Sequence, residues 1–164
     1  MELRKSFDFR ILFFLVSFLS FVALLSIGLS PAEATAQLEI SGDLFIPSIN
    51  LSSDVASLPL EDNRLKTPDE IVGSFSNHKN KTLLIGHSST IFHDLYKMTI
   101  GNLIVYNGHK YMVVNMDILD KQSISMSKIL KAETEDTLVL MTCAGEDYGN
   151  GDSSHRLILT ASVL

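Results

Sequence analysis

The chain has 164 residues with 13 basic and 19 acidic side chains, and it contains a single cysteine. A formal net charge of −6 argues against a nucleic-acid partner, and one cysteine excludes an internal disulfide. The length suits one domain together with a short targeting segment.

An uncharged apolar stretch, residues 11–29, follows three basic residues near the N-terminus. As a helix it would span about 28 Å, close to the hydrocarbon thickness of a bilayer. The positive charge before it predicts a single-pass anchor in the cell membrane, with the N-terminus inside and the working domain outside. The alternative is a signal peptide cleaved at the small residues 34–36, which would make the protein secreted, but the long apolar stretch favours the anchor. We therefore divide the chain into a basic start, membrane segment and spacer, 1–36, and an exported domain, 37–164.

The exported domain carries the whole net charge. Residues 37–164 hold 16 acidic and 10 basic residues, because three of each precede them. About 128 residues are enough to bury one hydrophobic core without staples. A free thiol in an oxidising compartment is a liability unless it is buried or used, which draws attention to Cys143.

Short apolar runs separated by polar turns dominate this domain and predict strands rather than long helices. The first strand should bend or bulge at Pro47, because proline cannot donate to a sheet ladder. Asn107–Gly108 between two β-rich runs predicts a tight hairpin, since both turn residues tolerate positive φ. After the 82–85 strand, Phe92 and Leu95 fall on one face of one or two helical turns. The expected elements are strands at 44–51, 82–85, 103–106, 111–119, 137–142 and 155–163, and short helices near 53–56, 88–98 and 125–131.

These elements add up to a mainly β, antiparallel domain of seven or eight strands. No internal repeat or low-complexity tract interrupts it. Closure removes exposed sheet edges, so a closed barrel is the expected architecture.

Cys143 ends the apolar strand 137–142 and precedes Ala-Gly-Glu-Asp, where the chain must leave the sheet. An unpaired cysteine is usually a small buried hydrophobe. A position at the end of a strand favours partial exposure, which a nucleophilic thiolate requires. The residue alone leaves both interpretations open.

His87 is the best candidate for proton transfer among the five histidines. It directly follows the buried strand 82–85, and Gly86 before it permits close backbone approach. The other four histidines fall in polar loops, in a helical turn or beside Arg156. A histidine at a strand end is itself more often structural than catalytic.

Arg156 opens an otherwise apolar final strand, where a charge is usually just solvated. If the last two strands pair antiparallel, Arg156 and Cys143 lie side by side. The 11-residue connection between them, 144–154, is longer than a usual hairpin loop and would form a mobile wall beside a site, or an idle loop. A thiol, an imidazole and a guanidinium at strand ends suit nucleophilic acyl transfer.

Acidic residues in the last connection also raise a calcium hypothesis. Glu146, Asp147 and Asp152 lack the alternating spacing of a calcium loop, which makes this hypothesis weak. The hypothesis of a zinc site is weaker still, because there is one cysteine and no histidine pair at ligand spacing. We therefore expect no metal and no cofactor.

Five segments in a fixed order resemble the sortase family of cysteine transpeptidases, over about residues 42–163. Each segment is unspecific by itself, and the order carries the resemblance. A membrane anchor ahead of an exported barrel is also the family's usual arrangement. The segments are the apolar-x-Ile-Pro-x-Ile strand at 44–51, the strand end Leu84–His87, Phe92-x-x-Leu95 followed by Gly101–Asn102, the run Leu138–Cys143, and Arg156 opening the last strand.

The resemblance implies a closed eight-stranded barrel and a transpeptidase that acts on exported proteins with a Leu-Pro-x-Thr-Gly-like sorting signal. Cys143 would attack the Thr–Gly carbonyl and form an acyl-enzyme. His87 would protonate the leaving amine and then deprotonate the incoming one. Arg156 would hydrogen-bond the substrate and the developing oxyanion, and Thr142 would help to bind the substrate. The acceptor would be an amine of the cell envelope, such as a peptidoglycan precursor, or a pilin lysine.

Two departures leave the sortase subclass and the sorting signal open: Asn102 stands where many members have aspartate, and Met141 where many have threonine. One alternative function is a catalytically idle barrel that serves as an anchored binding or scaffold module. Another is an L,D-transpeptidase-like enzyme acting on peptidoglycan. That family places a histidine close before its cysteine, and the run Met141–Ala144 has none.

Overall fold

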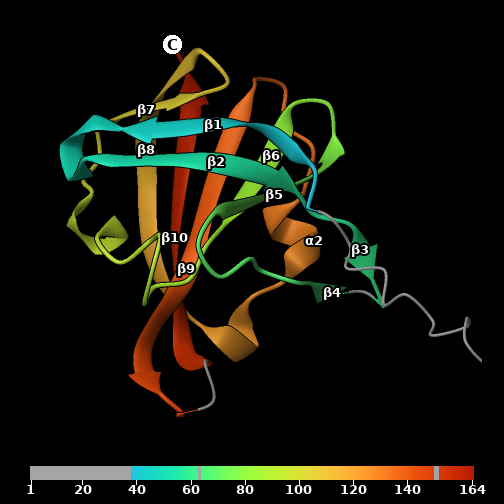
Figure 1. Cartoon of the computed structure of the whole chain (residues 1–164), viewed down its shortest axis with the longest axis vertical. Coiled ribbons are helices and arrows are strands. Elements are labelled where there is room, and N and C mark those ends of the chain that lie inside the picture. Colours follow the sequence, from blue (N-terminus) through green and yellow to red (C-terminus); the bar gives the residue numbers. More distant parts are fainter. Residues whose placement is uncertain (1–37, 63, 150–151) are drawn as a thin grey trace, which may run out of the picture. The chain divides into compact units, whose positions relative to one another are not determined.

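Eight strands close into a barrel in the computed structural model, which describes residues 38–62, 64–149 and 152–164 (Figure 1). Around the barrel the strands follow the order β1–β2–β5–β6–β9–β10–β8–β7. Their bounds are β1 (Ile40–Ile46), β2 (Leu51–Ser57), β5 (Val72–His78), β6 (Lys81–Ile85), β7 (Leu103–Tyr106), β8 (His109–Asp120), β9 (Thr137–Asp147) and β10 (Ser153–Val163). The other elements are a separate hairpin of β3 (Leu60–Glu61) and β4 (Arg64–Leu65), the 3₁₀ turns η1 (Pro47–Ile49), η2 (Leu95–Lys97) and η3 (Lys121–Ser123), and the helix α2 (Met126–Ile129).

The predicted membrane segment, 11–29, lies outside the described residues. Among those that are described, no helix has the length and apolar character needed to span a bilayer. Residues Leu38–Leu164 form one compact unit.

The prediction of a closed, mainly β barrel is confirmed, while two of its neighbouring strand pairs depart from the expected antiparallel arrangement. β2 pairs with β5, and β6 with β9, in parallel. Parallel neighbours need a long crossover. The β2–β5 connection carries the β3–β4 hairpin, and the β6–β9 connection carries β7, β8 and α2. The alternation of apolar residues tells which face a side chain takes, but not the direction of the neighbouring strand.

Two local expectations in the first half of the domain are also corrected. Pro47 does not bend a continuous strand; it begins η1, so β1 and β2 are separate strands that pair antiparallel. Asn50 completes this turn in the left-handed region, with φ of 50°. Residues 53–56, expected as a helix, lie in β2, where Val55 is fully buried. Burial of Val55 in the core fixes the extended conformation despite the polar residues around it.

The second half follows the prediction more closely. The Asn107–Gly108 turn joins β7 to β8, with φ of 49° and 75° at its two residues. Phe92 and Leu95 are both buried, as expected for turns that pack one face on the core. Helix α2 falls inside the predicted 125–131 segment. β9 and β10 run longer than predicted, so residues 144–147 and 153–154 of the expected loop lie in strands, seen in Figure 1 as a ribbon that extends beyond the other strands.

Three strands are apolar on both faces, and this places the groove described below. Every barrel strand contributes side chains to the interior core. β6, β9 and β10 add a second cluster on their outer faces, formed by Leu83, Ile85, Val139 and Ile158 together with Leu58. Strands covered on both faces read as continuous apolar runs, which is the pattern of these three segments. Residues in and beside α2 pack against the second cluster.

Candidate active site

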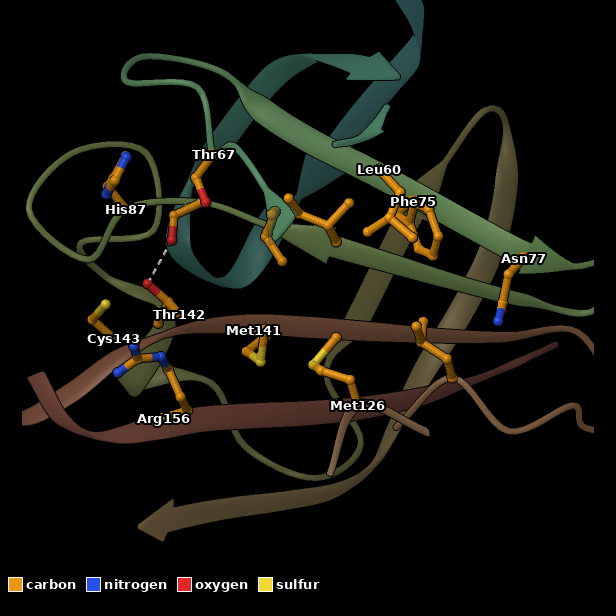
Figure 2. A pocket seen from close by; sticks show the side chains of 14 residues that line it. Leu60, Thr67, Phe75, Asn77, His87, Met126, Met141, Thr142, Cys143 and Arg156 are labelled. Atoms are coloured by element: carbon orange, nitrogen blue, oxygen red, sulfur yellow. Dashed lines mark hydrogen bonds between the residues drawn. The ribbon is translucent and has the colours of Figure 1, made fainter. Parts of the chain in front are cut away.

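A groove of about 620 Å³ lies along the outer face of β6 and β9, next to the second cluster (Figure 2). Its lining is mainly apolar, and the β3–β4 hairpin and α2 contribute to it from either side. Figure 2 shows the four predicted site residues gathered at one end of the groove, with Phe75, Asn77 and Met126 farther along. The groove is lined by Leu60, Leu65, Thr67, Phe75, Asn77, Ile85, Gly86, His87, Met126, Leu130, Met141, Thr142, Cys143 and Arg156.

Cys143 and Arg156 lie side by side, as the antiparallel hypothesis required. They are register partners in the β9–β10 ladder, so both side chains leave the same face of the sheet. Met141, two residues before Cys143, shares that face and lines the groove. Cys143 is a half-buried free thiol, and the Arg156 side chain is 16% exposed. A thiol with a cation beside it at the end of a groove has the components for attack on a carbonyl and stabilisation of the resulting oxyanion.

The Arg156 guanidinium is hydrogen-bonded to residues of the β9–β10 connection and the start of β10. Nη2 donates to Asp152 Oδ1 at 2.6 Å, and Nη1 donates to the carbonyls of Ser153 and His155 at 2.9 and 2.8 Å. Asp152 also accepts a hydrogen bond from Lys121 Nζ. The bonds from Lys121 and then Arg156 hold the pKa of the Asp152 carboxyl well below its ordinary value of 3.8, so it is a carboxylate at neutral pH.

Contacts at the end of β6 connect the histidine strand to the cysteine strand. The Gly86 N–H donates to the Met141 carbonyl at 3.4 Å, which continues the parallel β6–β9 ladder. The Thr142 hydroxyl then donates to the Gly86 carbonyl at 2.7 Å, the dashed line in Figure 2. Thr142 is only 5% exposed. Its hydroxyl therefore sets the distance between the two strand ends, and its part in substrate binding stays a prediction.

Gly86 has no room for a side chain. A Cβ atom there would lie 2.7 Å from Ile91 Cγ2 and 2.8 Å from Phe92 Cδ2. The chain turns back over the strand end at this point, because the Phe92 N–H donates to the His87 carbonyl at 3.0 Å. The close approach that the sequence attributed to Gly86 is thus made by the buried Phe92 ring.

The imidazole of His87 is at the same end of the groove but does not touch the thiol. Figure 2 shows it across from Cys143, and within the described residues no hydrogen bond joins the two side chains. Its charged neighbour is Asp69, with Nε2 and Oδ1 3.7 Å apart. The His87 side chain is 33% exposed and Asp69 almost fully so. An ion pair at this distance with one almost fully exposed partner is weak. Catalytic contacts are often long without substrate and tighten when it binds.

Sequence reasoning missed three charged residues next to the predicted site. Asp69 and Lys121 were not singled out, and Asp152 entered only as a calcium ligand. The spacing in the chain gives no signal for Asp69 or Lys121, because the topology brings them to partners that are distant in sequence, His87 and Asp152. Asp152 itself stands only four residues before Arg156. Across the ranges that the structure describes, no group of three or more histidine, cysteine, aspartate or glutamate side chains is placed to hold a metal ion.

Comparisons with known proteins agree with this geometry. The model of the sortase domain matches residues 44–164. Three solved structures have the same fold. A lid mutant of sortase A from Corynebacterium diphtheriae is 20% identical, with a TM-score of 0.61 over 82% of this chain and 74% of that one. Sortase C-1 from Actinomyces oris is 23% identical, with a TM-score of 0.58 over 76% and 72%. Group B Streptococcus Pilus Island 1 sortase C2 is 20% identical, with a TM-score of 0.59 over 77% and 74%.

A search of curated proteins gives no match. The family match is nevertheless extensive, since it begins within β1, reaches the last residue and includes His87, Cys143 and Arg156. The chain therefore belongs to the sortase family and is a cysteine transpeptidase of the sortase type.

Proposed function

We propose that the protein is a membrane-anchored sortase that cleaves a Leu-Pro-x-Thr-Gly-like sorting signal and transfers the exported protein to an amine acceptor. The observation that carries this proposal is the register pair of Cys143 and Arg156 at the end of an apolar groove. An extended peptide laid along the groove would bring a carbonyl to the thiol while its upstream apolar side chains contact the lining.

In the first half of the reaction, Cys143 Sγ attacks the Thr–Gly carbonyl carbon. The negative charge that develops on the carbonyl oxygen is stabilised by the Arg156 guanidinium, which has N–H donors beyond those that it directs to Asp152 and to the carbonyls of Ser153 and His155. The C–N bond then breaks, His87 gives its proton to the leaving amine, and a thioester remains on Cys143.

In the second half, an acceptor amine attacks the thioester. His87, now neutral, takes a proton from this amine, the C–S bond breaks, and the Cys143 thiolate is released. Both steps require the imidazole to come within hydrogen-bond reach of the amine at Cys143. Its weak pairing with the exposed Asp69 permits this movement.

The acceptor and the location follow from the same proposal. A cell-envelope amine, either a peptidoglycan precursor or a pilin lysine, would receive the cleaved protein. Residues 11–29 would hold the enzyme in the cell membrane with the barrel outside, where exported substrates and envelope acceptors meet. If residues 1–36 are removed as a signal peptide, the same barrel would be secreted.

Intact-protein mass spectrometry tests the proposal. The full chain in detergent is incubated with a panel of Leu-Pro-x-Thr-Gly-like peptides and no acceptor amine. We expect a mass gain equal to the N-terminal peptide fragment, absent in Cys143→Ala. The preferred peptide then identifies the sorting signal. An unreactive thiol and no adduct with any peptide would contradict the proposal and favour an idle barrel.

A further inference from the structure

We infer that Asp152 is a positioning residue for Arg156, and that Lys121 acts on Arg156 through the same carboxylate. The inference rests on the proposed function, in which Arg156 contacts the substrate. It assigns a role in transpeptidation to a charged bridge outside the groove, because neither Asp152 nor Lys121 lines it.

The carboxylate of Asp152 uses its two oxygens for two different cations. Oδ1 accepts from Arg156 Nη2 at 2.6 Å, and Oδ2 accepts from Lys121 Nζ. Lys121 begins η3, directly after β8, and Arg156 lies near the start of β10. The bridge thus connects the ends of two neighbouring barrel strands at the edge where the thiol is found.

The end of the bridge at Lys121 is itself fixed. Asp120 Oδ1 accepts from the Gln122 N–H at 2.7 Å, and the Asp120 carbonyl accepts from the Ser123 hydroxyl at 2.8 Å. Asp120 also pairs in register with His155, the neighbour of Arg156. Through Lys121, the Asp152 carboxylate is therefore bound to a turn of defined geometry, and the Asp152 side chain is only 29% exposed.

Arg156 needs such a partner because of where its charge must lie. An arginine side chain has many rotamers, and a guanidinium that stabilises an oxyanion must be in place before the charge develops. The carbonyls of Ser153 and His155 belong to the same strand as Arg156 and hold one nitrogen, Nη1. Asp152 holds the other, Nη2, so together they fix the plane of the group. Without Asp152, Lys121 and Arg156 would also be like charges close together with no anion between them.

The test is a double-mutant cycle on the full chain, with the rate of acyl-enzyme formation on the preferred peptide as readout. Arg156→Ala should lower this rate about 100-fold, the loss typical of removing one oxyanion donor. Asp152→Ala and Asp152→Asn should lower it about tenfold through misplacement of the guanidinium. In the Arg156→Ala background, Asp152→Ala should have no further effect, because it acts only through Arg156. Asp152→Glu should recover part of the rate, and Lys121→Met should lose less than Asp152→Asn.

Asp147→Asn is the matched control, since it makes the same charge change in the same hairpin. The Gly149 N–H donates to Asp147 Oδ1, and the amide oxygen of asparagine can accept the same hydrogen bond. The acylation rate of Asp147→Asn should therefore be unchanged. Full activity of Asp152→Asn, or losses that add in the double mutant, would overturn the inference. If Asp152→Ala does not fold, Asp152→Asn takes its place in the double-mutant cycle. If the unchanged chain forms no adduct with any peptide, the proposed function fails, and the inference fails with it.

Discussion

At the scale of single residues, the positions of His87 and Cys143 relative to one another are set by contacts of their chain neighbours. Gly86 lets the buried Phe92 ring close over the end of β6, and Thr142 joins that strand end to β9. The two reactive side chains are therefore placed by their neighbours in the chain, Gly86 and Thr142. A change at either neighbour should affect catalysis without removing a reacting group.

Gly86→Ala tests this dependence. The added Cβ would overlap Ile91 and Phe92, so the segment that carries His87 must move. We expect a loss of stability of about 1–3 kcal/mol from overpacking. The acylation rate should fall about 100-fold, the effect that a displacement near 1 Å can have. Thermal unfolding and intact-mass kinetics on the same preparation would measure both quantities.

Gly108→Ala is the control for Gly86→Ala. Gly108 has φ of 75° in the β7–β8 turn and open space around its Cα, so alanine there strains the backbone by about 1 kcal/mol without a clash. This variant should lose stability but keep its acylation rate per folded molecule. Equal activity losses in the two variants would show that the effect at Gly86 is only instability.

At the scale of elements, the connection before β9 is attached to β8 by a buried phenol. Tyr111 is 3% exposed, and its hydroxyl donates to Asp136 Oδ2 at 2.7 Å. Burial first, and then the bond to Asp136, raises the pKa of Tyr111 above its ordinary value of 10.0. Tyr111→Phe should therefore destabilise the barrel by about 1.5 kcal/mol at neutral pH, the lower end for a bond to a charged group because Asp136 is partly exposed.

The pH dependence of this difference follows from the direction of the shift. A raised pKa means that folding favours the protonated phenol, so the contribution is complete below about pH 10 and declines as pH rises further. The gap in unfolding free energy between the unchanged chain and Tyr111→Phe should narrow above pH 10. Urea unfolding between pH 7 and 11 would measure it, and a gap that stays constant or widens would refute the assignment.

The sequence predicted the strands that carry the site residues better than it predicted which segments pack on the outer face of those strands. Continuous apolar runs in β6, β9 and β10 predicted buried strands, and the antiparallel pairing of the last two brought Cys143 to Arg156 as expected. The runs do not reveal what covers their second face, so the groove beneath β3–β4 and α2 was not foreseen. Parallel pairing and the contact of Lys121 with Asp152 were missed for a related reason, because each depends on where a long connection returns.

At the scale of the whole molecule, the barrel is closed unevenly. The β9–β10 ladder continues without interruption from Cys143–Arg156 to Thr137–Ser162. β1 and β7 close the barrel through a much shorter ladder, with register pairs Leu44–Tyr106 and Phe45–Val105. The Asn107 side chain extends this seam, because its Oδ1 accepts from the Asp43 N–H at 3.0 Å. A short seam should be where the closed sheet opens first.

Hydrogen exchange followed by mass spectrometry on the full chain should therefore find the β7 amides unprotected sooner than those of β9 and β10. Asn107→Gly removes the side-chain bond to Asp43 but suits the positive φ of the turn, so it should speed exchange in β1 and β7 and leave β9 unchanged. If β7 stays protected as long as β9, the barrel opens as one cooperative unit. The β9–β10 ladder holds Cys143 and Arg156 far along the sheet from this seam, so opening there should leave the reactive pair in place.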